Sequence, residues 1–399
     1  MTLVRVVAHV PLDRSEQLPQ SPLDPPATTN RIGQTVDAVS PHPDASPRAV
    51  SQPNKRKPLK KLRIMVLIRE GLEPPDSLEG YTEKQIAEWK AEFDVIHTLR
   101  EMGHEVTTVG VYDDLSPIRK TIVQWKPHIA FMLLEEFHGV GVYDHAVVGY
   151  LELMRQRYTG CNPRGLMLSH DKALAKKLLA FHHVPTPAFH VYPVKHRIHR
   201  NRGLTFPLVV KSVIEDASLG ISQASIVHTD EALLERVKFV HATIGSDAMV
   251  EQYVEGRELY VGVIGNRRLE TFPIWEMRFE KMPADVAPIA TARVKWNPEY
   301  QEKYGITTGP AEKLSENLRD KIERVCKKVY RVLNMSGYAR MDLRLTEDDR
   351  IFILEANANP NLEYGEDFSE SAEVGGIDYE QLLDRILRLG LNYRAPWQA

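Results

Sequence analysis

Cysteine is almost absent from this chain, and long apolar runs are absent altogether. Only Cys161 and Cys326 occur among the 399 residues. Two cysteines cannot build a disulfide framework and suit a reducing compartment, so we expect a cytoplasmic protein. No run approaches the ~18 apolar residues of a membrane helix, and a net charge of −3 offers no basic surface to nucleic acid. We therefore expect neither a membrane nor a nucleic acid as a partner.

Residues 1–58 lack a sustained hydrophobic period. They are rich in Pro, Ser, Thr, Asp and Gln and end in a short basic run, which predicts a disordered tail. The apolar stretch from Leu3 to Val10 is short and is interrupted by Arg5 and His9, so we do not expect a signal peptide. Folded structure is expected from about residue 59.

The folded part has the apolar and charged fractions of an ordinary globular protein, 43% and 26%. Its first elements alternate between strand and helix periodicity, which predicts a small parallel, Rossmann-like α/β domain over residues 59–165. No G-x-G-x-x-G motif follows a strand, so nothing indicates a dinucleotide. The expected elements are strand 62–68, helix 83–102, strand 105–111, helix 116–125 and strand 128–134.

Strand-like runs dominate the chain after residue 165. We interpret residues 166–256 and 257–399 as two α+β domains that meet at a cleft. Within the second of them, long helices are expected at 316–333 and 378–389.

Two alternating runs near the C-terminus predict a β-hairpin. Apolar residues alternate with polar ones on both sides of an acidic turn at 347–349, which is the two-residue period of strands. With a turn of two or four residues, Asp342 faces Glu355 and Arg340 faces Asn357. An odd turn would shift this register by one residue.

A cation is expected on the polar face of this hairpin. Directly opposed residues have Cβ atoms about 5 Å apart, and like charges placed so repel each other. Asp342, Glu355 and Asn357 form an all-oxygen ligand set, which favours Mg²⁺ or Mn²⁺ over zinc. Such a site usually takes further ligands from substrate phosphates and so hints at a nucleotide. The alternative is an edge hairpin with solvated acids, which the apolar alternate faces disfavour.

A lysine near the end of the apolar strand 206–212 is a candidate phosphate ligand. Lys211 precedes a loop ending at Gly220, and together they offer a fixed cation and backbone N–H groups for phosphate oxygens. Strand-end lysines are commonly just solvated, and Lys172 lies on a helix with two other lysines, where a solvated face is the default. Neither lysine decides a function alone.

The segment 249–258 is predicted to be a strand that reaches a glycine bend. Glu251 and an exposed backbone N–H near Val254 would suit an adenine edge, and Glu258 would suit ribose hydroxyls. A strand followed by an acidic turn is the alternative, and it is preferred when the segment is taken alone.

The order of these motifs resembles the ATP-grasp fold, and residues 61–389 resemble D-alanine–D-alanine ligases. The resemblance implies that an N-terminal domain is followed by two α+β subdomains enclosing an ATP cleft. The matching segments are SHDKALAKKLLA (169–180), VPTP (184–187), EQYVEGRE (251–258), PAEKLS (310–315), GYARMD (337–342) and LEANANP (354–360).

The resemblance also implies roles for single residues. The ATP phosphates would be bound by Lys172, Lys211 and the loop residues Ser218 and Gly220, and Lys295 would bind the phosphoryl group that is transferred. Glu251 and Val254 would bind the adenine, and Glu258 would bind the ribose. Asp342, Glu355 and Asn357 would hold Mg²⁺, and Arg340 would stabilise the oxyanion of a tetrahedral intermediate. The implied reaction has two steps: a carboxylate attacks the γ-phosphate to give an acyl phosphate, and an amine then displaces phosphate.

The departures from the family cluster among the substrate residues. Ala217 replaces a substrate-organising Ser of the family's loop, and the family's Gly-Met-Thr continuation is replaced by a segment starting at Asn361. Glu366 then takes the position of a Ser that binds the acceptor's carboxylate. A carboxylate there repels another carboxylate and favours a cationic or amide group.

We therefore expect a carboxylate–amine ligase that uses ATP and Mg²⁺, acts on small molecules and has an altered acceptor pocket. The family further suggests a homodimer. Two alternatives stay open at this point: an ATP-grasp kinase that stops at a phosphorylated product, and an ATP-binding regulatory protein without ligase activity.

Overall fold

The computed structural model describes residues 59–214, 221–283 and 286–396. Contacts divide the chain into a unit Met1–Gln52 and a compact unit Pro53–Ala399, and the second holds all of the described residues. The predicted tail, residues 1–58, lies outside the described residues. None of the helices within the described ranges is long and apolar enough to cross a membrane.

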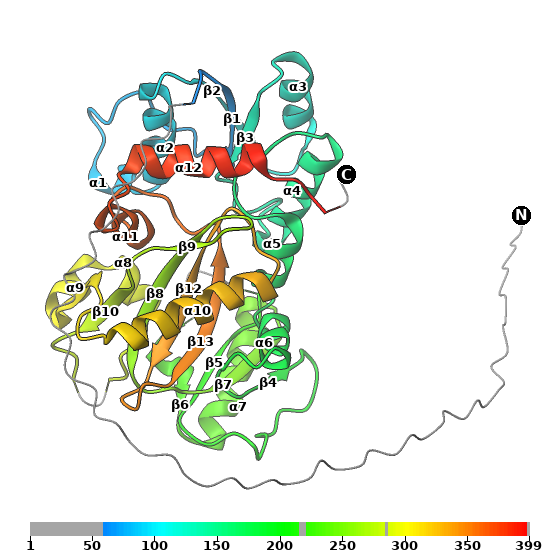
Figure 1. Ribbon diagram of the computed structural model, residues 1–399. Coiled ribbons are helices and arrows are strands. Elements are labelled where there is room, and N and C mark those ends of the chain that lie inside the picture. The colour runs from blue at the N-terminus through cyan, green and yellow to red at the C-terminus, as the bar shows by residue number, and fades with distance from the viewer. Residues whose placement is uncertain (1–58, 215–220, 284–285, 397–399) are drawn as a thin grey trace, which may run out of the picture. The chain divides into compact units, whose positions relative to one another are not determined.

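A small parallel sheet comes first in the described chain (Figure 1). Both neighbours of its central strand run parallel to that strand, which confirms the predicted βαβ unit. Its strands, in the order β2-β1-β3, are β1 (Arg63–Arg69), β2 (Glu105–Val111) and β3 (Ile129–Met132).

Side chains that alternate along β1 enter two different hydrophobic clusters. Ile64 and Val66 pack with residues of α2 (Lys90–Glu101) and α12 (Tyr379–Asn392). Met65 and Leu67 pack with residues of α3 (Ser116–Gln124) and α4 (Asp144–Leu153). Helices therefore cover both faces of this sheet, one of them from the far end of the chain.

The prediction of a single helix over residues 83–102 is wrong, because the structure has two helices there. These are α1 (Glu83–Ile86) and α2, and Trp89 between them has φ −140° and ψ 19°, outside the helical region. The Trp89 ring lies edge-on to Tyr81, with centroids 5.4 Å apart, and 6.1 Å from Phe93. The helical spacing of apolar residues continues through the break, which is why periodicity alone did not reveal it.

A four-stranded antiparallel sheet follows. Its order is β4-β7-β5-β6, and Val210 and Val250 pack against Leu233 and Val237 of α7 (Asp230–Phe239). The strands are β4 (Phe189–Tyr192), β5 (Leu208–Ser212), β6 (Ile226–Val227) and β7 (Ala248–Gln252).

The third sheet has six strands in the order β11-β10-β8-β12-β13, with β9 paired to β8. The apolar stripe of α10 (Glu316–Val332), including Ile322, Cys326 and Val329, packs with the β12 residues Met341 and Leu343. The strands are β8 (Arg257–Ile264), β9 (Glu270–Thr271), β10 (Trp275–Phe279), β11 (Ile306–Pro310), β12 (Tyr338–Leu345) and β13 (Ile351–Ala358).

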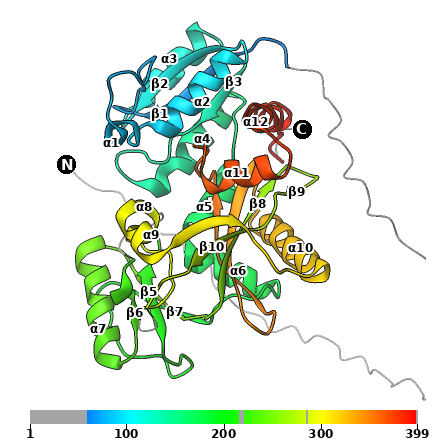
Figure 2. The same cartoon turned by 90° about the vertical axis from the view of Figure 1, so that its left-hand side faces the viewer.

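The remaining helices lie between or after these strands along the chain (Figure 2). α10 and α12 confirm the two long helices predicted near the C-terminus. The others are α5 (Pro163–His170), α6 (Lys172–Phe181), α8 (Ala292–Trp296), α9 (Pro298–Tyr304) and α11 (Asp367–Val374), with short helical turns at Gly141–Tyr143, Gln223–Ser225 and Val240–Ile244.

Candidate active site

The hairpin β12–β13 has the predicted register. Asp342 pairs with Glu355 and Arg340 with Asn357. The turn is nevertheless odd, since the five residues 346–350 separate the last pair of the ladder. A regular ladder would then oppose Asp342 to Leu354, but Leu354 is an extra residue that forms a β-bulge and returns Glu355 to that place.

Asp342 is buried and held by two neighbouring side chains. The Arg340 guanidinium donates to both of its carboxylate oxygens, at 2.8 and 3.0 Å, and Nδ2 of Asn357 donates to Oδ2 at 3.0 Å. Burial raises the pKa of Asp342 and the charge of Glu355 adds to the rise, while Arg340 and Lys295 oppose it. Arg340 also lies over the ring of Tyr260, 4.8 Å from the centroid.

The residues predicted to hold a metal fit a hard cation. Within the described ranges no group of three or more His, Cys, Asp and Glu side chains is placed to hold a metal. The predicted set has only two carboxylates, Asp342 and Glu355, with the amide of Asn357. Each carboxylate disfavours the charge of the other, and oxygen ligands of this kind suit Mg²⁺. A divalent cation would relieve that repulsion.

Three lysines and two carboxylates lie close together beside the hairpin. Glu251 on β7 is only 2% exposed and pairs with Lys211 of β5 and, at 3.0 Å, with Lys176 of α6. Lys172, one turn earlier on α6, lies 3.8 Å from Glu355. α6 and strands of the two antiparallel sheets thus bring Lys172, Lys211, Glu251 and Glu355 into one charged cluster.

Sequence reasoning missed Lys176. It is 2% exposed, and its Nζ also donates to the Ile353 carbonyl at 3.4 Å. Burial lowers the pKa of Lys176, although Glu251 opposes this. Burial alone would raise the pKa of Glu251, but the charges of Lys176 and Lys211 hold it below its usual value. The available signal was the four-residue spacing from Lys172, which places both lysines on one helix face.

Glu258 accepts hydrogen bonds from two residues, Arg344 and Tyr260, for which the sequence analysis predicted no role. Arg344 donates to its Oε2 at 2.5 Å, and the Tyr260 hydroxyl donates to its Oε1 at 3.0 Å. Arg344 is 3% exposed and also donates to the carbonyls of Gly256 and Pro288. A ribose hydroxyl would therefore meet a carboxylate that is already fixed, with lone pairs left on each oxygen.

Two further candidates are placed and two are not. The amide of Val254 donates to no residue of the described chain. Lys295 lies on α8, close enough to Asp342 for its charge to oppose the rise in the pKa of that carboxyl. Ser218 and Gly220 lie outside the described residues.

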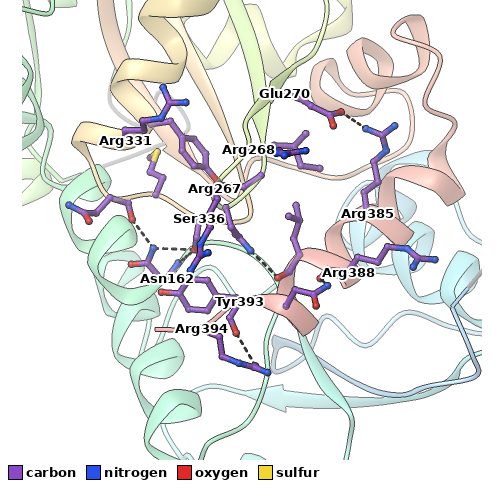
Figure 3. Close-up of a pocket in the computed structure, with 18 of the residues that line it drawn as sticks. Asn162, Arg267, Arg268, Glu270, Arg331, Ser336, Arg385, Arg388, Tyr393 and Arg394 are labelled. Atoms are coloured by element: carbon purple, nitrogen blue, oxygen red, sulfur yellow. Dashed lines mark hydrogen bonds and ion pairs between the residues drawn. The ribbon is translucent and has the colours of Figure 1, made fainter. Parts of the chain in front are cut away.

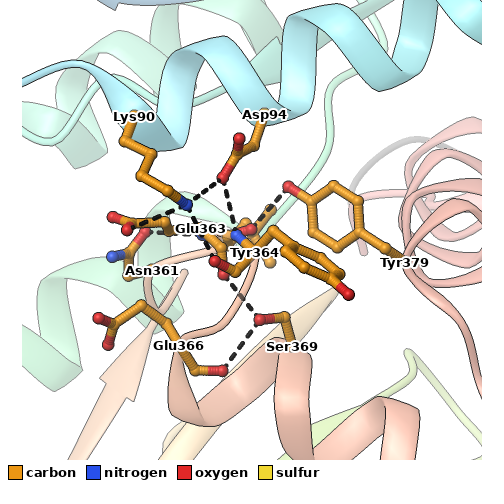
Figure 4. Close-up of polar contacts among 9 residues, drawn as sticks. Lys90, Asp94, Asn361, Glu363, Tyr364, Glu366, Ser369 and Tyr379 are labelled. Carbon is orange, nitrogen blue, oxygen red and sulfur yellow. Dashed lines mark hydrogen bonds and ion pairs between the residues drawn. The ribbon is translucent and has the colours of Figure 1, made fainter. Parts of the chain in front are cut away.

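The loop 361–366 is tied to α2 of the first sheet (Figure 4). Lys90 contacts Glu363 Oε1 at 3.2 Å, Asp94 Oδ2 at 2.8 Å and the Tyr364 carbonyl at 3.0 Å. Asp94 in turn accepts from the Tyr364 amide at 3.0 Å. The Oδ1 atom of Asn361 accepts from the Glu363 amide at 2.9 Å, so this side chain shapes the loop.

Comparisons with known proteins relate the chain to one enzyme family. The family model described as "D-ala D-ala ligase C-terminus" matches residues 178–388, just over half of the chain. The D-alanine–D-alanine ligase of Desulfotalea psychrophila is 30% identical over 265 residues, which are 66% of this chain and 78% of that protein. An uncharacterised protein of Sinorhizobium fredii, y4sG, is 30% identical over 332 residues, 81% of this chain and 92% of its own.

The chain belongs to the D-alanine–D-alanine ligase family. This is a family of ATP-grasp enzymes that are ATP-dependent carbon–nitrogen ligases, as the sequence indicated. The solved D-alanine–D-alanine ligase of Bacillus anthracis in complex with ATP has the same fold, with a TM-score of 0.63 and 22% identity over 83% of this chain and 97% of that one.

In the present member of the D-alanine–D-alanine ligase family, several carboxylates lie near the loop 361–366. Glu366, half-buried before α11, has a raised pKa because of burial and the neighbouring charges of Asp367 and Glu363, while Arg340 and Lys90 oppose the rise. Glu92 of α2 is 9% exposed, and its pKa rises to about 7 through burial, with Glu135 and Glu363 adding to the effect. The sequence analysis assigned no role to Glu92.

Proposed function

We propose that this protein is an ATP-dependent carboxylate–amine ligase that works through an acyl phosphate and accepts an amine without a neighbouring carboxylate. The observation that supports the catalytic half is the meeting of the Lys172–Lys211–Glu251 cluster with the Asp342–Glu355 pair. Residues from four separate segments of the chain converge there, namely α6, β5, β7 and the β12–β13 hairpin, and their charges suit a polyphosphate and a cation.

The proposed reaction has two balanced steps. A carboxylate oxygen of the first substrate bonds to the γ-phosphorus of ATP as the bond to the bridging oxygen breaks, which releases ADP. An amine nitrogen then bonds to the acyl carbon, the C–O bond to phosphate breaks, and the amine loses a proton. Phosphate and an amide are the products.

The chain's own residues would position the charged groups for these steps. Lys172 and Lys211 would contact phosphate oxygens, and Glu251 would hold Lys211 in place because its buried carboxylate pairs with that ammonium. Arg340 would face the oxyanion that develops when the amine attacks, since Asp342 fixes its guanidinium through two hydrogen bonds.

Further residues near this cluster are proposed to bind the adenosine and the cation. The amide of Val254, which donates to no residue in the described ranges, would donate to the adenine, and Glu258 would accept from the ribose. Asp342, Glu355 and Asn357 would hold Mg²⁺ or Mn²⁺, which when bound neutralises charge on the phosphates. A cytoplasmic location and a homodimer remain predictions from the sequence and the family resemblance.

The acceptor preference is proposed from the charges around Glu366. This half-buried carboxylate already lies near Glu363 and Asp367, and the opposing cations are Arg340 and Lys90. A carboxylate on the acceptor would add a further negative charge at this place. An acceptor with a neutral amide or a second ammonium group would avoid that repulsion.

The test compares matched acceptors that differ only in this group. ADP release is measured with Mg²⁺, a panel of carboxylic acids, and either D-alanine or D-alaninamide as the amine. We expect the amide to be at least about 10-fold the better acceptor by kcat/KM, because a charge repulsion of this kind costs more than 1.4 kcal/mol. Glu366→Ser should narrow or reverse that preference without loss of turnover.

A second variant tests the metal assignment separately. Glu355→Gln should abolish ADP release with every pair while leaving the circular dichroism and melting temperature close to those of the wild type. Tight ATP binding without ADP release under any mixture would contradict the ligase and indicate a regulatory protein. A stable phosphorylated product would indicate a kinase.

A further inference from the structure

A large hollow lined by arginines lies away from the proposed active site (Figure 3). It has a volume of about 990 Å³ and is lined by seven arginines, no lysine and a single acidic residue, Glu270. The whole chain carries a net charge of −3. The seven arginines and one glutamate give this hollow a strongly positive lining in a chain whose overall charge is slightly negative.

None of the residues proposed to bind ATP or the cation lines this hollow. Its wall includes Ser336, just before β12, whereas Asp342 lies six residues further along the chain, roughly 20 Å at about 3.3 Å per residue. The lining residues come from α5, the turn between β8 and β9, the end of α10 and the last turns of α12. None of the phosphate or metal roles proposed above accounts for it.

The backbone under the arginines is fixed by hydrogen bonds. Asn266 in the β8–β9 turn donates from Nδ2 to the Leu389 carbonyl at 3.1 Å and accepts from the Gly337 amide at 3.0 Å. The Tyr330 hydroxyl donates to the Gly265 carbonyl at 2.7 Å. Gly265 has φ +137°, and a Cβ there would collide with the Arg268 carbonyl, so the turn requires glycine. The hollow is a preformed feature of the fold.

The charges of two arginines at the tip of this turn are not balanced by an ion pair with any described residue. Arg267 and Arg268 are exposed, and neither pairs with a residue in the described ranges. Arg385 pairs with Glu270 at 2.6 Å, and Arg388 pairs with Asp384 at 2.6 Å. Adjacent unpaired cations on a rigid turn repel each other, and an anion bound between them would remove that repulsion.

We propose that this hollow binds a small polyanion with two or more phosphate or carboxylate groups. Arginine without lysine indicates bidentate recognition, because the guanidinium fork matches the oxygens of phosphate and carboxylate groups. The volume suits a compact ligand enclosed from several sides. An extended nucleic acid would need a basic surface beyond the hollow, which the net negative charge of the chain does not supply.

Arg267→Ala/Arg268→Ala tests the proposal, because neither side chain makes a hydrogen bond or ion pair with another described residue. Inorganic tripolyphosphate and citrate are the probes, titrated into the full chain by calorimetry. We expect the double variant to bind the better probe at least about 10-fold more weakly than wild type, since each hydrogen-bonded charge contact contributes strongly. Tripolyphosphate as the better probe identifies phosphates as the recognised groups, and citrate identifies carboxylates.

Arg119→Ala/Lys120→Ala is the matched control, because it removes the same charge from two exposed side chains of α3 that make no hydrogen bond or ion pair in the described part of the chain. It should leave the affinity within about twofold of wild type. Equal loss in both double variants, or no binding of either probe to wild type, would overturn the proposal. So would binding that is lost in Lys211→Met but kept in Arg267→Ala/Arg268→Ala, because the probe would then occupy the ATP cleft. Tighter arginine-dependent binding of a single-stranded RNA would overturn the small-ligand assignment.

Discussion

Glu92 is a charged residue on the buried stripe of a helix. It lies one turn after Trp89 and one turn before Ile96, whose side chain belongs to a hydrophobic cluster. With only 9% of its surface exposed and a pKa of about 7, it is held in a place that favours the neutral acid. A carboxyl that gives up its proton near neutral pH beside the loop 361–366 is a candidate for proton transfer or for binding a cation.

Glu92→Gln should stabilise the protein at pH 8 and have little effect at pH 4.5. The folded state binds a proton more tightly than the unfolded state, whose pKa is near 4.5, so the wild type loses stability as the pH rises from about 4.5 to 7. Glutamine removes that loss, which amounts to at most about 3 kcal/mol. Urea unfolding of both proteins from pH 4.5 to 8 measures the difference, and a difference independent of pH would contradict the account.

Single residues could be predicted where their chemistry is local. Asp342, Glu355 and Lys211 follow from alternation and strand position, and the structure places them as expected. Lys176 and Arg344 could not be found in the same way, because their importance comes from burial against Glu251 and Glu258, which lie on distant segments. A long charged side chain looks solvated in a sequence until its partner is known.

Among the elements, the β12–β13 hairpin depends on one extra residue. Ile351, Ile353 and Ala356 are buried on one face, whereas Glu355 and Asn357 lie on the other. The change of parity occurs at Leu354, where the bulge lies. Alternation predicted the pairing but not the bulge, because an odd turn and an extra residue compensate each other and leave Asp342 paired with Glu355.

Two single-residue deletions separate these effects. Deleting Leu354 removes the bulge but keeps Asp342 opposite Glu355, so the protein should fold and retain ADP release. Deleting Ala356 turns Asn357 towards Met341 in the core, which should cost more than about 3 kcal/mol through a buried amide and lost packing. Thermal unfolding of the two variants measures this contrast. Equal destabilisation would show that the bulge has another role.

At the scale of the whole molecule, the first and last described elements share a core. Leu382, Leu383 and Ile386 of α12 pack in one hydrophobic cluster with Ile64 and Val66 of β1. The four-stranded sheet has a separate cluster around Leu233. Sequence periodicity predicted each helix and strand here, but not this pairing, because contacts across more than 300 residues leave no local pattern.

Leu383→Ala should therefore loosen the N-terminal sheet. The side chain is fully buried, and its truncation is expected to cost about 2–5 kcal/mol. Hydrogen exchange followed by mass spectrometry should show faster exchange in β1 as well as in α12. Leu233→Ala, the matched control, should accelerate exchange in residues 189–252 and leave β1 unchanged. Protection of β1 that survives Leu383→Ala would show that the sheet is stable without this helix.

The shared core also has a consequence for synthesis on the ribosome. The three strands of the first sheet have all been synthesised by residue 132, but α12 begins only at Tyr379. At about 5–20 residues per second, the nascent sheet waits roughly 12–50 s with one apolar face incomplete. Early termination of translation anywhere in this interval leaves that face open, so premature release of this chain is a direct route to aggregation.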